Sequence, residues 1–243
     1  MTSPRFAICI PMANEETSFS SFIAELSRVI DAYPGVSVYL VTDKASTDAT
    51  PELCLRLQQQ DSRYHAIWAP ENKNVVDAYL RGFREAMREK PDFIIEMDGG
   101  GSHAPQDIPA FVEAMAAGYE CAFGSRYIEG GSMEHSPFRR RFLSRFGSFL
   151  ARALLSCPMQ DATSGFEAFR YEVMERLLAY PLRSQAHFYQ TELRYLLRHS
   201  KWIEVPIHYT SPSPRVSRKA LLNACQCLFH YTLSHLSGKG KKL

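Results

Sequence analysis

The chain has 243 residues and a mass of 27.6 kDa, the size of one large α/β domain or two small ones. With 45% hydrophobic and 22% charged residues it has enough apolar material for a packed core, which excludes disordered and fibrous proteins. Lys and Arg number 28 against 26 Asp and Glu, and a net charge of +2 is too small for nucleic-acid binding through bulk charge.

Short β-rich runs alternate with helix-period stretches in the first half of the chain. The predicted strands are Phe6–Ile10, Val36–Thr42, His65–Trp68, Phe93–Met97 and Glu120–Phe123. The predicted helices between them are Ser18–Ala32, Asp48–Gln59, Val75–Arg88 and Gln106–Ala117. This alternation predicts βαβ units around a parallel sheet, in which ligands bind at the carboxyl ends of the strands.

The second half is less regular. Its predicted helices lie at Pro137–Leu155, near Tyr171–Ala179, near Gln190–His199 and at about Lys219–Leu236, with a strand at Trp202–Tyr209. Six cysteines are scattered without the spacing of a disulfide framework or a paired zinc site, so we expect reduced thiols. The reduced thiols predict a cytoplasmic protein, with the cytoplasmic face of a membrane as a more specific location. Pro11 interrupts the first apolar run too early for a signal peptide.

Nine short motifs follow one another along the chain. They are PMANEE (Pro11–Glu16), VTDKASTDAT (Val41–Thr50), NKNVVDAYLRG (Asn72–Gly82), EMDGGGSHAP (Glu96–Pro105), GSRY (Gly124–Tyr127), RRRFLSR (Arg139–Arg145), DATSGFEAFR (Asp161–Arg170), FYQTE (Phe188–Glu192) and EVPIHY (Glu204–Tyr209). In this order and spacing the chain resembles the family-2 glycosyltransferases, and among them the polyprenyl- or dolichyl-phosphate sugar synthases of the dolichyl-phosphate mannosyltransferase type. The resemblance runs from about Phe6 to about Leu236.

The resemblance implies the GT-A fold, an α/β fold with a Rossmann-like, mostly parallel central sheet and helices on both faces. It also implies an inverting transfer of a hexose from a nucleotide-diphosphate sugar to polyprenyl phosphate. Because a phosphate acceptor is already ionised at neutral pH, such a reaction needs no strong general base. It needs instead two anionic groups held together and a stabilised leaving diphosphate.

The same resemblance implies where the donor nucleotide binds. Asp43 matches the first acid of the family's DDGS turn, which accepts from the base or the ribose, although Lys44 replaces the second acid and Ala45 the glycine. The residues expected to help form this pocket are Pro11, Asn14 and Glu15. A plain turn is the alternative interpretation of Asp43.

Asp98 is the predicted catalytic and metal-ligating residue. The family usually has an Asp-x-Asp pair here, which binds Mg²⁺ or Mn²⁺ against the diphosphate, but Gly100 stands in the place of the second acid. Substrate phosphates and water can complete the coordination of such hard cations. Glu96 alternates onto the same strand face and is a candidate second carboxylate, and His103 is expected to reach the donor phosphates. A tight turn is the alternative explanation of the three glycines.

The resemblance also implies which residues bind the acceptor phosphate. They are Arg126, Arg140, Ser144 and Arg218. Arg140 and Ser144 are spaced i, i+4 and would lie on one helix face, but a solvated basic face is the alternative for such an arginine run. Asp161 is the predicted catalytic carboxylate on the acceptor side, either orienting the acceptor or taking a proton from a hydroxyl, with a turn cap as the alternative. Two residues match the lining of the sugar pocket, Gln190 and Glu192.

The C-terminal stretch Ala220–Gly238 lacks charged residues but has polar side chains at helical spacing, so we expect an amphipathic helix rather than a transmembrane one. We therefore divide the chain into a catalytic domain, residues 1–218, and an amphipathic helix with a basic tail, residues 219–243. The lysines of the tail, at about 1 kcal/mol each near an anionic surface, supply about 3 kcal/mol toward peripheral membrane contact. Packing on the core is the equally open alternative. The tail lysines are Lys239, Lys241 and Lys242.

Transfer of a hexose to polyprenyl phosphate is the leading interpretation. A family-2 enzyme with a saccharide hydroxyl acceptor is the second, and in that enzyme Asp161 would have to act as the base. A nucleotide-sugar-binding protein without catalysis is the third, motivated by Gly100 and Lys44. A dinucleotide-dependent oxidoreductase is disfavoured, since PMANEE rather than G-x-G-x-x-G follows the first strand.

Overall fold

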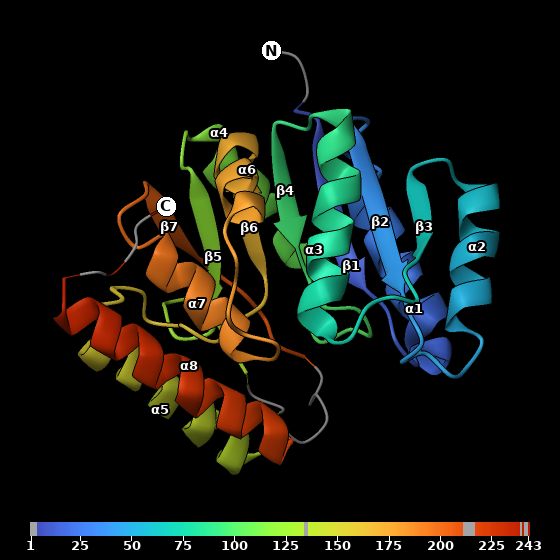
Figure 1. Ribbon diagram of the computed structural model, residues 1–243. Helices are drawn as coiled ribbons and strands as arrows, with labels where there is room; N and C mark the ends of the chain where they lie inside the picture. Colours follow the sequence, from blue (N-terminus) through green and yellow to red (C-terminus); the bar gives the residue numbers. More distant parts are fainter. Residues whose placement is uncertain (1–3, 134–135, 211–216, 239, 241–242) are drawn as a thin grey trace.

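The computed structural model describes residues 4–133, 136–210, 217–238, 240 and 243 (Figure 1). Its centre is one seven-stranded sheet in the order β3-β2-β1-β4-β6-β5-β7. The strands are β1 (Phe6–Pro11), β2 (Val36–Thr42), β3 (Tyr64–Trp68), β4 (Phe93–Glu96), β5 (Cys121–Ser125), β6 (Glu167–Arg170) and β7 (Trp202–Pro206). The helices are α1 (Glu16–Ile30), α2 (Thr50–Gln60), α3 (Val75–Ala86), α4 (Ile108–Ala116), α5 (Phe138–Leu155), α6 (Tyr171–Ala179), α7 (Phe188–Leu196) and α8 (Arg218–Leu236), with short 3₁₀ turns η1 (Met87–Glu89) and η2 (Pro105–Asp107).

The sheet is parallel except at β6, which pairs antiparallel with both β4 and β5. The predicted α/β fold with a mostly parallel sheet is thus confirmed. The strand β6 itself was not predicted, because its four residues follow directly on the polar motif beginning at Asp161 and show no apolar run of their own.

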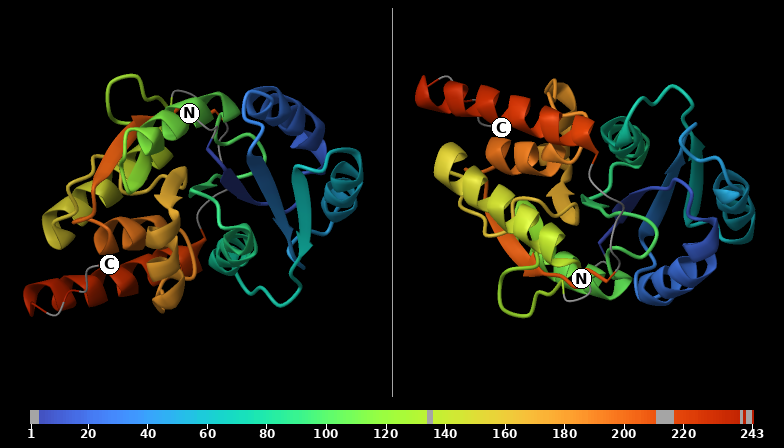
Figure 2. Two further views of the ribbon diagram at one scale, coloured as in Figure 1. Left: turned by 90° about the horizontal axis from the view of Figure 1, so that it is seen from above. Right: turned by 90° about the horizontal axis from the view of Figure 1, so that it is seen from below.

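Helices cover both faces of the sheet (Figure 2). One face packs its apolar side chains against α1, α2 and α4, around residues such as Ile8, Ile95 and Phe111. The other face packs against α3, α6 and α7, around Phe83, Phe169 and Leu196. Because alternate side chains of a strand point to opposite faces, strands buried on both sides need the nearly continuous apolar runs that this sequence has.

The topology brings the polar motifs to one edge of the sheet. The carboxyl ends of β1, β2 and β4 are neighbours there, as the strand order requires. The register pairs Glu96 at the end of β4 with Glu167 at the start of β6, so the segment that precedes the antiparallel β6 arrives at the same edge. The ends of β5 and β7 also meet there, where Ser125 pairs with Pro206. Residues far apart in the sequence can therefore form one site.

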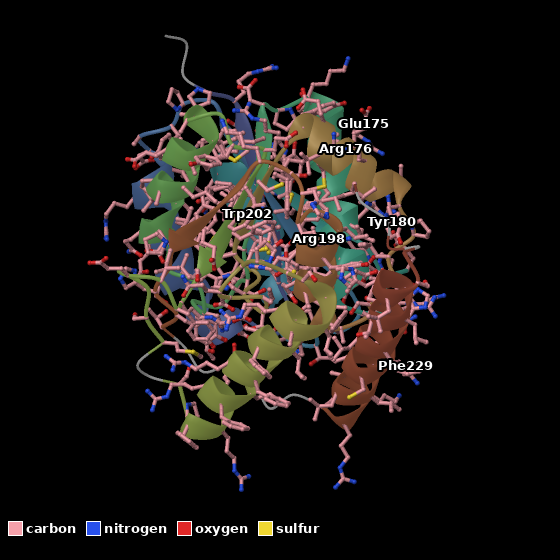
Figure 3. All side chains as sticks on the ribbon, turned by 90° about the vertical axis from the view of Figure 1, so that its left-hand side faces the viewer. Glu175, Arg176, Tyr180, Arg198, Trp202 and Phe229 are labelled. Atoms are coloured by element: carbon pink, nitrogen blue, oxygen red, sulfur yellow. The ribbon has the colours of Figure 1, made fainter. Side chains whose placement is uncertain are left out.

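Helices α5 and α8 contact each other and lie side by side at one end of the molecule, as Figures 1 and 3 show. The helix α8 packs on the domain through Cys227 and Tyr231, while Phe229, labelled in Figure 3, is 67% exposed. None of the helices in the described part of the chain has the length and apolarity that crossing a bilayer requires. All six cysteines are free thiols, and Cys225 on α8 is the exposed one.

Candidate active site

Asn14 joins the turn after β1 to the turn after β2. Its side-chain amide donates to the carbonyl of Ala45 at 2.8 Å, and its Oδ1 accepts from the backbone N–H of Thr47 at 2.9 Å. Its φ of 60° lies in the left-handed region, which asparagine tolerates better than most residues. Asp43 closes its own turn by accepting from the Ala45 N–H at 2.8 Å. Both residues thus shape the predicted nucleotide pocket, and their contact with a nucleotide stays a prediction.

Asp98 follows β4 and is held by two aromatic side chains. The buried Tyr79 hydroxyl donates to Asp98 Oδ1, and the backbone N–H of Asp98 donates to His103 Nδ1 at 2.9 Å. Burial lowers the pKa of His103, so the ring is neutral and its proton is on Nε2, 3.8 Å from Asp98 Oδ2. The Asp98 side chain remains 40% exposed. Asp98 therefore has a fixed, open carboxylate, and His103, only 1% exposed, lies behind it.

Gly165 separates Asp98 from Gln190. A Cβ at position 165 would lie 3.0 Å from Gln190 Nε2 and 3.6 Å from Asp98 Oδ1. The missing side chain therefore lets the glycine of the TSG motif approach both polar groups. The predicted site residue Gln190 is placed beside Asp98 by this contact.

Glu15, at the start of α1, lies against the glycine turn after Asp98. A Cβ on Gly100 would fall 2.2 Å from Glu15 Oε2, so the carboxylate fills the place that a side chain at position 100 would need. Burial, together with the nearby carboxylates of Asp48 and Asp98, raises the pKa of Glu15.

Asp98 and Glu15 supply oxygen donors of the kind that Mg²⁺ and Mn²⁺ prefer. Within the described ranges no cluster of three or more His, Cys, Asp or Glu side chains could hold a metal. A cation at Asp98 would therefore need further oxygens, which substrate phosphates and water provide. The donor set fits a divalent cation shared with a diphosphate.

Glu96 is not the second carboxylate. It is fully buried in β4, where its Oε2 accepts from the Tyr189 hydroxyl at 3.0 Å. Burial and the neighbouring Glu167 raise its pKa well above the ordinary value. A carboxyl enclosed in this way cannot reach a cation that the exposed side of Asp98 holds.

Arg126 and Asp161 form a buried ion pair at the end of β5. Arg126 Nε donates to Asp161 Oδ2 at 2.7 Å and its Nη2 donates to Oδ1 at 2.8 Å. Burial alone would raise the pKa of Asp161, but the Arg126 guanidinium lowers it to about 2. The same guanidinium donates to the hydroxyls of Ser144 at 2.9 Å and Thr163 at 2.7 Å. Asp161 thus holds the group that binds these two hydroxyls.

Asp161 does not fit the predicted role of a base. It is fully buried, and a carboxylate of such low pKa is a weak proton acceptor at neutral pH. Its backbone N–H donates to Glu204 Oε1 at 3.0 Å, so β7 also fixes its turn. Asp161 instead holds the Arg126 guanidinium in place.

Tyr209, which follows β7, lies between the two arginines. Its ring centroid is 5.5 Å from the Arg126 guanidinium and 5.4 Å from that of Arg140, and its hydroxyl accepts from Arg140 Nη2 at 3.0 Å. On its other side its ring meets that of His103, with centroids 6.0 Å apart. We did not predict a role for Tyr209, although its motif EVPIHY was recognised. It links the Asp98 side of the site to the arginine side.

A groove of about 270 Å³ opens from the arginines between α5 and α8. Its inner end is polar and includes Arg126, Arg140, Ser144 and Thr163. Its walls along the two helices are largely apolar and include Leu143, Phe146, Leu150, Leu221, Ala224 and Leu228. Three of the residues predicted to bind the acceptor phosphate, Arg126, Arg140 and Ser144, line this groove, but the sequence did not predict its apolar walls.

Glu192 does not line the site, contrary to the prediction. It is fully buried, and its two oxygens accept from the N–H groups of Arg183 at 2.7 Å and Ser184 at 2.8 Å. The hydroxyl of Tyr231 on α8 also donates to it. Glu192 therefore ties a loop and α8 to α7.

The remaining predicted residues belong to the C-terminal segment, residues 218–243. Arg218 is exposed at the first turn of α8, and its contact with a phosphate stays a prediction. The tail lysines at 239, 241 and 242 lie outside the described residues.

Three comparisons with known proteins identify what this chain is similar to. The sequence model of Glycosyl transferase family 2 matches residues 7–178, which is more than half of the chain. This chain belongs to that family. The predicted resemblance is confirmed, and the chain is a glycosyltransferase.

Curated relatives cover most of the chain. It is 32% identical over 228 residues to a polyprenol monophosphomannose synthase of Mycolicibacterium smegmatis, covering 93% of this chain and 84% of that one. An undecaprenyl-phosphate mannosyltransferase of Micrococcus luteus is 30% identical over 207 residues, covering 84% of this chain and 83% of that one. A dolichol-phosphate mannosyltransferase of Pyrococcus furiosus is 31% identical, with 84% of this chain and 56% of the relative covered.

Solved structures share the fold. Glucosyl-3-phosphoglycerate synthase from Mycobacterium tuberculosis, in complex with Mn²⁺, UDP and phosphoglyceric acid, matches with a TM-score of 0.63 at 16% identity. The match covers 99% of this chain and 80% of that one. The same enzyme has been crystallised with Mg²⁺ and UDP, and that structure matches with a TM-score of 0.61 at 17% identity, covering 98% of this chain and 79% of that one. The GT-A fold of this chain is thereby confirmed.

Proposed function

We propose that the protein transfers a hexose, with inversion, from a nucleotide-diphosphate sugar to the phosphate of a polyprenyl phosphate. The observation that carries this proposal is the groove between α5 and α8. It joins guanidinium and hydroxyl donors at one end to an apolar channel, and a polyprenyl phosphate has the same two parts in the same order. The names of the curated relatives, a polyprenol monophosphomannose synthase and the mannosyltransferases of undecaprenyl phosphate and dolichol phosphate, support it.

The state of Asp161 favours a phosphate over a hydroxyl acceptor. A hydroxyl acceptor would need a base, and the acid first considered for that role is buried against Arg126 with a pKa near 2. A phosphate monoester is already an anion at neutral pH and needs orientation more than deprotonation. The charge-assisted donors of Arg126 and Arg140 can supply that orientation.

The reaction forms a bond from a phosphate oxygen to the anomeric carbon and breaks the bond from that carbon to the diphosphate on the opposite face. A divalent cation, when bound, offsets the charge of the leaving diphosphate. Asp98 would hold that cation, and Tyr79 and His103 fix its carboxylate. Gln190, which lies near Asp98, would contact the donor sugar. The arginines on the far side of Tyr209 would present the acceptor phosphate.

Calorimetric titration with farnesyl phosphate and with inorganic phosphate tests the groove. Leu143→Gln replaces an apolar wall residue and should weaken farnesyl phosphate binding about tenfold, because the lost apolar contact is worth about 1.5 kcal/mol. Inorganic phosphate binding should not change. Leu154→Gln on the same helix is the matched control, since Leu154 is 38% exposed against 41% for Leu143 but lies outside the groove. Equal effects of both variants on farnesyl phosphate would contradict the assignment.

We further propose that two helices dock the protein on a membrane surface. They are α5, in the domain of residues 1–218, and α8, which makes up most of the segment of residues 219–243. Four phenylalanines of α5 are 46–74% exposed and stack along the helix with centroids 6.0–6.5 Å apart. They are Phe138, Phe142, Phe146 and Phe149. The neighbouring helix α8 also carries exposed apolar residues, including Leu222, Phe229, Leu233 and Leu236. Exposed arginines at 139, 141, 145 and 152 border the phenylalanines, as suits an anionic headgroup region.

Vesicle flotation tests the docking surface. The native chain should float with vesicles of anionic phospholipid at low salt, and the double variant Phe142→Glu, Phe146→Glu should not. Leu55→Glu is the matched control, because Leu55 is 51% exposed on α2, away from α5 and α8. Flotation of the double variant to the native extent would refute docking through α5.

A further inference from the structure

The turn after β4 has no acid at position 100, but another carboxylate occupies the space there. Gly100 has a φ of +70°, and a Cβ on it would lie 2.2 Å from Glu15 Oε2 and 2.6 Å from Oε1. Contacts this short do not occur between real Cβ atoms and their neighbours, so any side chain at position 100 requires Glu15 to move. The two positions therefore compete for one place beside Asp98.

Glu15 is held in this place from both sides. Its backbone N–H donates to Thr50 Oγ1 at 2.8 Å, which ties the start of α1 to the start of α2. Its Oε2 accepts from Ser18 Oγ at 2.7 Å, one turn further along α1. A carboxylate oxygen can accept more than one hydrogen bond or serve as a ligand as well, so the Ser18 contact orients Glu15 without exhausting it.

The neighbouring turn also approaches closely. A Cβ on Gly99 would lie 2.5 Å from the sulfur of Met12 and 3.0 Å from the carbonyl oxygen of Pro11. The turns after β1 and β4 are thus packed directly on each other, with glycines on the β4 side. This close packing places the Glu15 carboxylate, from the β1 side, at the rim that carries Asp98.

We propose that Glu15 is the second carboxylate for the divalent cation in this protein, so that the acid missing from position 100 is supplied by the turn after β1. The inference rests on the proposed function, which provides the diphosphate that shares the cation. Mg²⁺ and Mn²⁺ take oxygen ligands, and one or two carboxylates with substrate phosphates and water are a common set. Asp98 and Glu15 would be the two carboxylates here.

Electron paramagnetic resonance of Mn²⁺ added to the metal-free protein tests this assignment without any turnover. Glu15→Gln keeps the size of the side chain and the contact with Ser18 but removes the charge. It should raise the dissociation constant for Mn²⁺ about tenfold or more, because affinity depends on the number of charged oxygen ligands. Glu16→Gln is the matched control, an exposed neighbour with the same loss of charge, and it should change the constant less than about twofold.

A swap of the acid provides the sharper test. Glu15→Ala should weaken Mn²⁺ binding, and the double variant Glu15→Ala, Gly100→Asp should restore it, because the carboxylate returns to the same place from the other turn. Aspartate tolerates the left-handed conformation at position 100 better than most residues. Gly100→Asp alone should lower the melting temperature, since its side chain meets Glu15.

Two results would overturn the inference: Mn²⁺ binding by Glu15→Gln equal to that of the native chain, or a double variant that binds no better than Glu15→Ala. An assay of hexose transfer, which counts label from a radiolabelled nucleotide-diphosphate hexose in the lipid fraction, tests the proposed function separately. Glu15-dependent Mn²⁺ binding without any labelled lipid would refute the proposed function and leave the Glu15 assignment standing. Labelled lipid together with Mn²⁺ binding that does not depend on Glu15 would support the proposed function and refute the Glu15 assignment.

Discussion

Replacing Asp161 by asparagine distinguishes a positioning residue from a base. The ionised Asp161 is fully buried, and the lowering of its pKa from 3.8 to about 2 corresponds to about 2–3 kcal/mol of stability. Removing the charge also leaves the Arg126 guanidinium buried without its counter-ion, and breaking such pairs costs about 3–5 kcal/mol. We therefore expect Asp161→Asn to lose about 3 kcal/mol. For a domain of this size that is a fall of about 6–12 °C in melting temperature.

The assay is thermal and urea unfolding followed by circular dichroism, together with acceptor kinetics. Asp161→Asn should raise the acceptor KM, because Arg126 loses its orientation. Asp61→Asn is the matched control: Asp61 forms a similar pair with Arg63, but the two side chains are 26% and 27% exposed, so the cost should stay below about 1 kcal/mol. A variant at Asp161 with native stability and an abolished kcat would refute this reasoning and restore the base.

The pH dependence has a defined sign. Because the pKa of Asp161 is lowered in the folded protein, its contribution to stability is complete above about pH 4 and is lost as the pH falls toward 2. The native chain should therefore lose more stability over this range than Asp161→Asn does, as measured by urea unfolding at each pH. Parallel curves for the two proteins would contradict the lowered pKa.

Three further substitutions test the rest of the site. Asp98→Ala should lower kcat about a hundredfold or more, measured by steady-state transfer, and a residual rate near that of the native enzyme would contradict its role. Arg140→Ala should raise the acceptor KM about tenfold, since a charge-assisted hydrogen bond is worth about 1.5–3 kcal/mol. It should raise the donor KM less than about twofold. Equal effects on the two KM values would show that Arg140 is not part of the acceptor site. Tyr79→Phe should lower kcat about tenfold, with the free energy of unfolding changed by less than about 1 kcal/mol, because only the hydrogen bond that positions Asp98 is lost. A Tyr79→Phe enzyme with native kcat would show that this bond is dispensable.

The sequence predicted the sheet well where periodicity was strong. The runs from Phe6 and from Val36 are strands within a residue of their predicted ends, because strands buried on both faces need continuous apolar side chains. Residues 167–170 carry no such signal, and their antiparallel strand is determined by pairing with β4 and β5. The local hydrophobic pattern of a segment does not show which distant strands it pairs with.

The positions of the candidate site residues were predicted well where a motif identifies them and wrongly where packing between distant segments determines them. Asp98, Arg126 and Gln190 lie at the predicted edge of the sheet. Glu192 has the same motif match, but its neighbours in space, the loop at residues 183–184 and Tyr231, occupy its oxygens. The contact of Glu15 with Gly100 joins two turns that are far apart in the sequence, so no spacing rule could reveal it.

A transfer assay with matched acceptors tests the central claim most directly. The protein is incubated with radiolabelled nucleotide-diphosphate hexoses and either polyprenyl phosphate or the polyprenol of the same length, and label is counted in the lipid fraction. Labelled lipid from the phosphate but not from the alcohol is the predicted result, because the arginine end of the groove is proposed to bind a phosphate and Asp161 is too weak a base to deprotonate an alcohol. Equal labelling of the two lipids, or label only in water-soluble products, would contradict the account.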